Sequence, residues 1–66
     1  MNNIKRLRES MGLTQTGLAD RLGVKPPAVF KWENEIPPPK YENLLAMSKL
    51  FGCSMDHVMG QDTASA

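Results

Sequence analysis

The sequence predicts an all-α domain of five short helices, and three observations carry that prediction. Apolar residues recur at helical spacing along nearly the whole chain, whereas the apolar–polar alternation typical of strands is almost absent. Glycines and N-capping residues stand between these apolar segments, where helices are expected to end and begin. The chain has 66 residues, a length that provides for one domain and not for two.

The first two helices are predicted from apolar spacing and capping residues. A first helix covers residues 4–11 and ends at Gly12, since glycine is the usual residue after a helix. Thr14 suits the N-cap of a second helix, because its hydroxyl can accept a backbone hydrogen bond there. That helix runs to Leu22 and is closed by Gly23. The two segments are therefore expected to form separate helices joined by a short turn.

The third helix begins in a proline pair. Pro26 and Pro27 fit a first helical turn, where the missing N–H has no intrahelical partner in any case. Pro27 also disfavours helical geometry at Pro26, so the start is expected at either of these two residues. The helix runs to about Asn34, and the stiff Pro-rich segment 36–39 follows it as a loop.

The C-terminal part of the chain predicts two more helices. Residues 40–51 carry a wide apolar face and end before Gly52, and Ser54 caps a short helix that Gly60 ends. Residues 1–60 are thus expected to form the domain, and residues 61–66 a flexible C-terminal tail. Fifteen apolar side chains are expected in the core: Ile4, Leu7, Met11, Leu13, Leu18, Ala19, Leu22, Val24, Val29, Trp32, Leu44, Leu45, Phe51, Met55 and Val58.

The charges are distributed unevenly, although the net charge is only +1. Residues 1–31 carry six basic and two acidic side chains, a net charge of +4, and residues 32–66 carry a net charge of −3. An anionic partner is therefore expected to dock on the N-terminal half. Lys5, Arg6 and Arg21 are interpreted first as solvated residues of helix surfaces, and the alternative for each is contact with a phosphate.

Several classes of protein are disfavoured by composition. A single cysteine, Cys53, forms neither an internal disulfide nor a structural zinc site, and it is interpreted as a small apolar filler. No apolar run approaches the ~20 residues of a membrane span, and the N-terminal residues do not resemble a secretory leader. We therefore expect a cytoplasmic protein. We also expect no enzyme, cofactor, metal site, small-molecule ligand or membrane partner.

The outward face of the third helix is the strongest candidate for a functional surface. On a helical wheel, Val29 and Trp32 lie on the core side. The opposite arc holds an exposed phenylalanine beside prolines and a lysine, which is unusual for a merely solvated surface. This arc consists of Pro26, Pro27, Phe30, Lys31 and Asn34.

Residues 15–34, QTGLADRLGVKPPAVFKWEN, resemble the helix-turn-helix of phage Cro and repressor proteins and their bacterial XRE-like relatives. The resemblance extends over about residues 2–60. It implies a compact lambda-repressor-like domain of five helices, in which the second and third form the helix-turn-helix and the third enters the major groove. The resemblance places these residues at DNA: Gln15 at a phosphate, Asn34 near the backbone, and Lys25, Pro26, Pro27, Phe30 and Lys31 at the groove.

The start of the third helix departs from the family pattern. Where relatives usually have Ser or Thr followed by polar side chains, this chain has Lys25, Pro26 and Pro27. Because proline donates no hydrogen bond, base readout is expected from the two lysines, or from apolar contact of Pro27 and Phe30 with thymine methyl groups.

Arg8 lies within the apolar stripe of the first helix, where an unpaired charge would cost several kcal/mol if buried. The resemblance suggests Glu33 as its partner in a structural salt bridge. The alternative is that the Arg8 side chain extends to solvent or to a phosphate.

The function expected from this resemblance is sequence-specific binding of a double-stranded DNA operator by a transcriptional regulator. The regulator is expected to be a Cro-like repressor of a bacterium or phage that acts as a homodimer in the cytoplasm. Met55, His57 and Val58, near the C-terminus, are the candidates for the dimer interface. The alternative is a protein-interaction or antitoxin-like module that uses the exposed Pro26, Pro27 and Phe30 surface.

Overall fold

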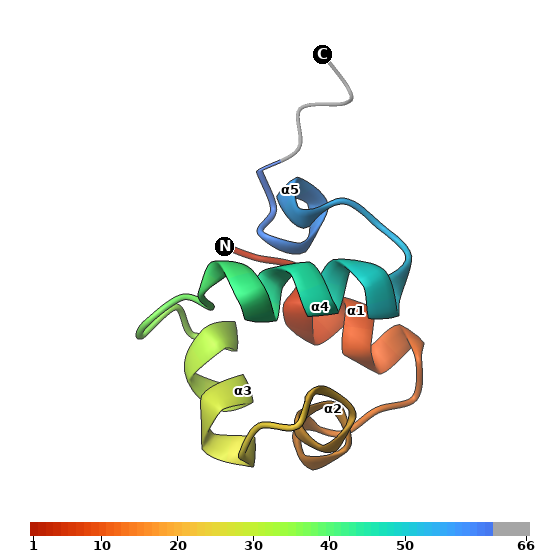
Figure 1. Ribbon diagram of the computed structural model, residues 1–66, viewed down its shortest axis with the longest axis vertical. Coiled ribbons are helices and arrows are strands. Elements are labelled where there is room, and N and C mark those ends of the chain that lie inside the picture. The colour runs from red at the N-terminus through yellow and green to blue at the C-terminus, as the bar shows by residue number, and fades with distance from the viewer. Residues whose placement is uncertain (62–66) are drawn as a thin grey trace.

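The computed structural model describes residues 1–61 and confirms the all-α fold, with five helices and no strand in that range. None of these helices is long and apolar enough to cross a membrane. Except for Gln61, the expected tail lies outside the described residues. The helices are drawn in Figure 1: α1 (Ile4–Ser10), α2 (Gln15–Leu22), α3 (Pro26–Glu33), α4 (Tyr41–Phe51) and α5 (Met55–Val58).

The helix boundaries follow from the capping residues that the sequence predicts. The Thr14 hydroxyl accepts a hydrogen bond from Gly17 N at 2.9 Å, and the Ser54 hydroxyl accepts one from His57 N at 3.0 Å. α3 begins at Pro26, the earlier of the two expected starts. The observed helices differ from the predicted ones by one residue at three ends. α1 and α3 end one residue earlier than predicted, and α4 begins one residue later.

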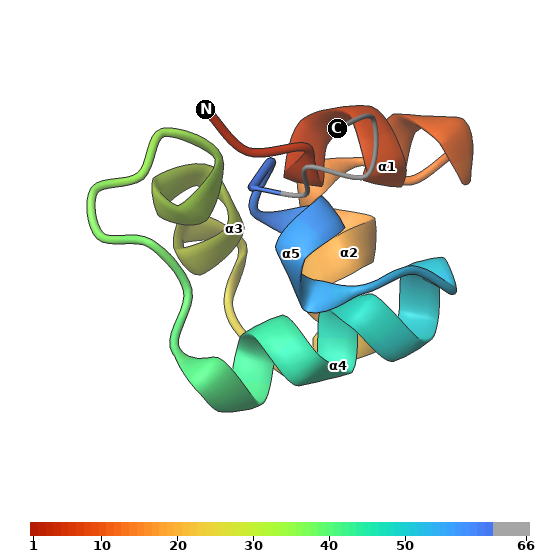
Figure 2. The ribbon, with the colours of Figure 1, turned by 90° about the horizontal axis from the view of Figure 1, so that it is seen from above.

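The helices enclose one core, to which every helix contributes. α2 packs against α3, and these two helices are contacted by α1, which touches α3, and by α4, which touches α2 (Figures 1 and 2). α5 packs against α4. The side chains of Val29 and Trp32 point inward, as the helical wheel predicts. The buried apolar residues are Ile4, Leu18, Ala19, Val29, Trp32, Met47 and Val58.

Two methionines differ from the expected core. Met11 is 41% exposed, because α1 ends at Ser10 and the chain turns away before the Met11 side chain can continue the apolar stripe. Met47 is completely buried, although the expected core contains Leu45 in its place. The buried centre of α4 lies at Met47 and Ser48, which leaves the neighbouring Leu45 only half-buried.

The N-terminal segment joins the ends of two helices that are distant in sequence. Asn3 N donates to the Val58 carbonyl oxygen at 2.9 Å, and Asn3 Nδ2 donates to the His57 carbonyl oxygen at 2.7 Å. Asn2 Nδ2 donates to the Trp32 carbonyl oxygen at 2.8 Å. Residues 1–3 therefore connect the end of α5 to the end of α3, and Figure 2 shows them running between these helices.

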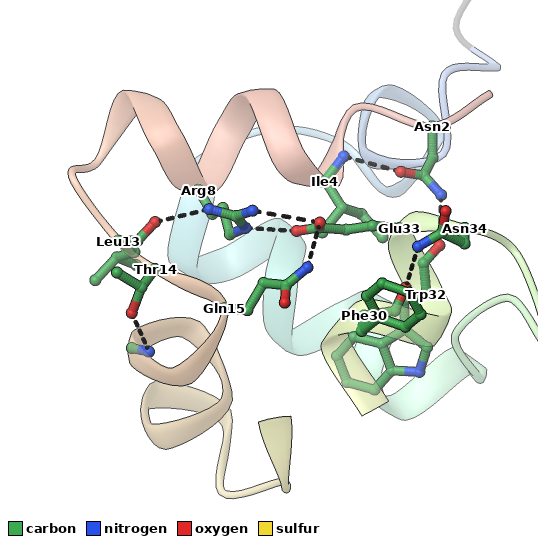
Figure 3. A network of polar contacts seen from close by, with 11 residues as sticks. Asn2, Ile4, Arg8, Leu13, Thr14, Gln15, Phe30, Trp32, Glu33 and Asn34 are labelled. Atoms are coloured by element: carbon green, nitrogen blue, oxygen red, sulfur yellow. Dashed lines mark hydrogen bonds and ion pairs between the residues drawn. The ribbon is translucent and has the colours of Figure 1, made fainter. Parts of the chain in front are cut away.

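A buried ion pair joins α1 to α3. Arg8 and Glu33 are in contact through both carboxylate oxygens, with Arg8 Nη2 3.3 Å from Glu33 Oε1 (Figure 3). Arg8 Nη1 also donates to the Leu13 carbonyl oxygen at 3.0 Å. Both charged side chains are at least nine-tenths buried. The structure thus has Arg8 paired with the partner that the resemblance suggests, and not extended to solvent.

Replacing Gly60 with alanine is expected to destabilise the domain more than the same change at Gly12. Both residues have a φ of 71°, which costs an L-residue about 1 kcal/mol. A Cβ at Gly12 meets open space, whereas one at Gly60 overlaps the Met1 carbonyl oxygen. Urea denaturation should show a loss of about 1 kcal/mol for Gly12→Ala and about 3 kcal/mol for Gly60→Ala. Equal losses would contradict the close packing of residues 1–3 against the end of α5.

Glu33→Gln is expected to lower the free energy of unfolding by about 3 kcal/mol, because it leaves the Arg8 guanidinium buried without a counter-charge. The matched control is Glu42→Gln, which changes an exposed carboxylate of α4. Thermal and urea denaturation measure both variants. An unchanged melting temperature for Glu33→Gln would show that the ion pair does not hold α1 against α3.

Candidate nucleic-acid interface

The outward face of α3 is an apolar and basic surface. Pro26, Pro27 and Lys31 are exposed, and Phe30 is 57% exposed although it is a large hydrophobic side chain. The other side of the helix is fixed in the core through Val29. The protein therefore presents these four side chains on a helix that is held rigidly from behind.

The start of α3 lacks the first two backbone N–H groups that a helix usually offers to an anion. Lys25 is the exposed N-cap, and its side chain makes no capping hydrogen bond. Pro26 and Pro27 have no N–H, and Ala28 N donates to the Lys25 carbonyl oxygen at 2.9 Å. An approaching DNA strand thus meets proline rings and one lysine side chain here.

The start of α2 has the opposite character. The Thr14 side chain and carbonyl oxygen accept from Gly17 N and Leu18 N, whereas the N–H groups of Gln15 and Thr16 make no hydrogen bond within residues 1–61. Free N–H groups and the helix dipole give a helix start a partial positive charge. This end of α2 is therefore suited to an anion such as a phosphate.

The buried ion pair positions the Gln15 side chain. Gln15 Nε2 donates to Glu33 Oε1 at 3.0 Å, so α2 is bonded to the same carboxylate as α1 (Figure 3). The hydrogen bond to Glu33 raises the pKa of Arg8, aided by the negative charges of Glu33 and Glu9 and opposed by burial. A raised pKa means that Arg8 holds its proton more tightly in the folded protein than in the unfolded chain. The resulting contribution to the free energy of unfolding is therefore present at all pH values below arginine's ordinary pKa, and it is lost as the pH rises above that value.

Asn34 lies at the C-cap of α3, and its side chain bonds to its own helix. Asn34 Nδ2 donates to the Phe30 carbonyl oxygen at 2.8 Å. Asn34 and Gln15 line a common groove of about 350 Å³, which lies between α1, the start of α2 and the end of α3. The groove is lined by Met1, Asn2, Lys5, Arg8, Gln15, Phe30, Glu33 and Asn34.

This groove also contains residues that sequence reasoning did not assign to a site. Asn2 and Lys5 line it, although the sequence gives no reason to single out Asn2 and favours a solvated surface position over a phosphate contact for Lys5. Only the folded structure shows that these residues share a groove with Gln15 and Asn34, because 29 positions separate Lys5 from Asn34 in the chain.

The residues expected at a dimer interface are placed differently by the structure. Met55 and His57 are half-buried on α5, and each retains some exposed surface. Val58 is completely buried in the core, so Met55 and His57 are the two of these three candidates whose side chains retain surface. Cys53 packs against the core, and residues 1–61 contain no cluster of three metal-ligating side chains.

A family comparison matches residues 4–58 to the helix-turn-helix model. The chain is 36% identical over 59 residues to repressor protein C2 of Salmonella phage P22, covering 89% of this chain and 27% of that protein. It is 33% identical over 57 residues to the HTH-type transcriptional regulator YqaE of Bacillus subtilis, covering 86% of this chain and 49% of that protein. The chain thus spans less than half the length of these curated relatives.

Solved structures agree with this assignment. The crystal structure of the P22 c2 repressor in complex with a synthetic operator superposes with a TM-score of 0.81, at 35% identity over 91% of each chain. A transcriptional regulator from Listeria innocua has a TM-score of 0.79, at 28% identity over 88% of this chain and 54% of that one. The chain therefore belongs to the helix-turn-helix family, a family of non-enzymatic DNA-binding domains, and it has the fold of the P22 c2 repressor.

Proposed function

We propose that this protein is a sequence-specific transcriptional regulator that occupies a double-stranded operator as a dimer, with α3 in the major groove. The observation that carries the proposal is the exposed outward face of α3, which stands beside the free N–H groups at the start of α2. A helix-turn-helix needs these two features, one to meet base edges and one to hold the backbone. The similarity to a repressor crystallised on an operator supports the same function.

Lys31 is proposed as the principal polar contact to a base. It is exposed on the outward face of α3, and within residues 1–61 it makes no ion pair. A lysine in the major groove donates hydrogen bonds to guanine O6 and N7. Lys25, at the start of the helix, is proposed to contact DNA through its charge. Gln15 and Asn34 are proposed to contact the phosphate backbone.

Pro27 and Phe30 are proposed to contact thymine. They are exposed, apolar and on the same face of α3 as Lys31. The only apolar group of a base edge in the major groove is the thymine C5 methyl group. Since Pro26 and Pro27 provide no donor, apolar contact is the readout that this part of the helix supports best.

Dimer formation and repression are proposed as well. Helix-turn-helix dimers bind two half-sites about one helical turn apart, and Met55 and His57 remain the candidates for pairing. Occupation of a promoter operator would block polymerase, so repression requires no cofactor or further domain. The likeness to the P22 repressor supports repression, and the Cro-like character of the repressor is part of the proposal.

A selection of bound sequences from a random DNA pool tests the function. We expect an enriched motif with two related half-sites about 34 Å apart, which is the spacing that a symmetric dimer requires. A single enriched half-site would contradict the dimer, and the absence of any enriched motif would contradict sequence-specific binding. Retention of a protein partner without DNA binding would favour the interaction module that uses Pro26, Pro27 and Phe30.

Lys31→Ala is expected to weaken binding to the selected operator and to reduce the slope of log K against log salt by about one unit, because one cation leaves the interface. Lys49→Ala is the matched control, since Lys49 is an exposed lysine on α4. Fluorescence anisotropy at several salt concentrations measures both slopes. Equal slopes of log K against log salt for the two variants would show that Lys31 does not contact DNA.

Replacing individual thymines of the selected operator with uracil tests the apolar readout. Loss of a contacted methyl group should weaken binding about fourfold, which corresponds to about 0.8 kcal/mol of apolar burial. The effect should disappear in Phe30→Ala or Pro27→Ala at the position that each side chain contacts. A protein that binds thymine and uracil operators equally well at every position would exclude methyl readout.

A further inference from the structure

The groove between α1, α2 and α3 brings Asn2 of the N-terminal segment and Lys5 of α1 to the side of the molecule that carries Gln15 and Asn34. We propose that this groove receives one backbone phosphate of bound DNA, with Lys5 as its cationic contact and Asn2, Gln15 and Asn34 as its hydrogen-bond donors. The inference rests on the proposed function and adds Lys5 and Asn2 to the DNA-contacting residues.

Three side-chain amides give the groove a set of fixed donors. Each amide nitrogen carries two N–H groups, and one is already used within the protein. Asn2 Nδ2 donates to Trp32 O, Gln15 Nε2 to Glu33 Oε1, and Asn34 Nδ2 to Phe30 O, at 2.8, 3.0 and 2.8 Å. These bonds fix the orientation of the three amides, and each retains a second N–H for a ligand. A phosphate oxygen accepts several such bonds at once.

The charges on the groove wall favour an anion. They belong to Lys5, Arg8, Glu33 and the amino group of Met1. Glu33 is neutralised by Arg8, and the Met1 amino group lies 3.4 Å from a Glu35 carboxylate oxygen. Lys5 is exposed and makes no ion pair within residues 1–61. The remaining charge is therefore the positive charge of Lys5.

The location of the groove favours a phosphate of the DNA backbone over a free anion. The groove begins at Phe30 and Asn34, on the same helix as the proposed base contact Lys31, and it extends to the start of α2. When a recognition helix lies in the major groove, the preceding helix crosses the backbone, so a strand passes along this side.

Lys5→Gln tests the proposal, with Lys49→Gln as the matched control on α4. Lys5→Gln is a surface change that leaves the core intact. The slope of log K against log salt for operator binding should become shallower by about one unit for Lys5→Gln and should not change for Lys49→Gln. The ratio of the parent protein's affinity to that of Lys5→Gln should therefore grow about eightfold for each tenfold dilution of salt. The two variants should have equal salt slopes if the groove does not contact DNA, and this result would overturn the proposal.

A scan of methylphosphonate substitutions along the selected operator locates the phosphate. Neutralising one particular phosphate per half-site should weaken binding by the parent protein, and should weaken binding by Lys5→Gln clearly less, because only the amide contacts to that phosphate remain in the variant. Additive effects at every phosphate would overturn the inference while leaving DNA binding intact. If the parent protein shows no salt-dependent DNA binding, the proposed function fails, and the inference fails with it.

NMR of the side-chain amides distinguishes the two sources of phosphate. The resonances of Asn2, Gln15 and Asn34 should shift on addition of operator duplex and not on addition of inorganic phosphate at the same phosphate concentration. Saturable shifts with inorganic phosphate, together with a salt slope that does not depend on Lys5, would identify a site for free anions and overturn the assignment to DNA.

Discussion

The ion pair between Arg8 and Glu33 is the constraint on which the rest of this structure depends. It lies where α1, α2 and α3 meet, and both charged side chains are at least nine-tenths buried. A buried charge that loses its partner costs far more than an exposed one, so the position of α1 relative to the end of α3 is specified closely. The same carboxylate accepts the hydrogen bond from Gln15, and the start of α2 is thereby aligned with the two other helices.

This pair also changes the meaning of the charge distribution. By sequence, the first 31 residues carry a net charge of +4, but the charge of Arg8 is cancelled inside the molecule by Glu33 from the acidic half. The basic side chains that remain for a partner are on the surface, and Lys25 and Lys31 lie at either end of the outward face of α3. A near-neutral chain is therefore compatible with a polyanionic partner, because electrostatic attraction depends on the local surface and not on the net charge.

Local signals predicted the helices well, whereas contacts between distant residues set the details that the sequence did not reveal. Thr14 and Ser54 act through hydrogen bonds within three residues, so their positions alone specify two helix starts. The burial of Met47 depends on which part of α4 faces the other helices, and the apolar face of that helix is too wide to decide it. The groove formed by Asn2, Lys5, Gln15 and Asn34 is built from three segments, and no pattern along the chain connects them.

The two helices of the motif differ in what they offer to DNA, and the difference begins with their first residues. α2 starts with a threonine cap and two free N–H groups, which suit a phosphate. α3 starts with two prolines that remove such donors. The start of α3 therefore binds a phosphate weakly, and its apolar rings are better suited to contact a thymine methyl group. α2 is thereby suited to bind the DNA backbone and α3 to discriminate among bases. The two helices are joined through Glu33, the last residue of α3, which accepts a hydrogen bond from Gln15, the first residue of α2. A change in the readout surface of α3 can thus alter sequence preference while the backbone contacts stay in place.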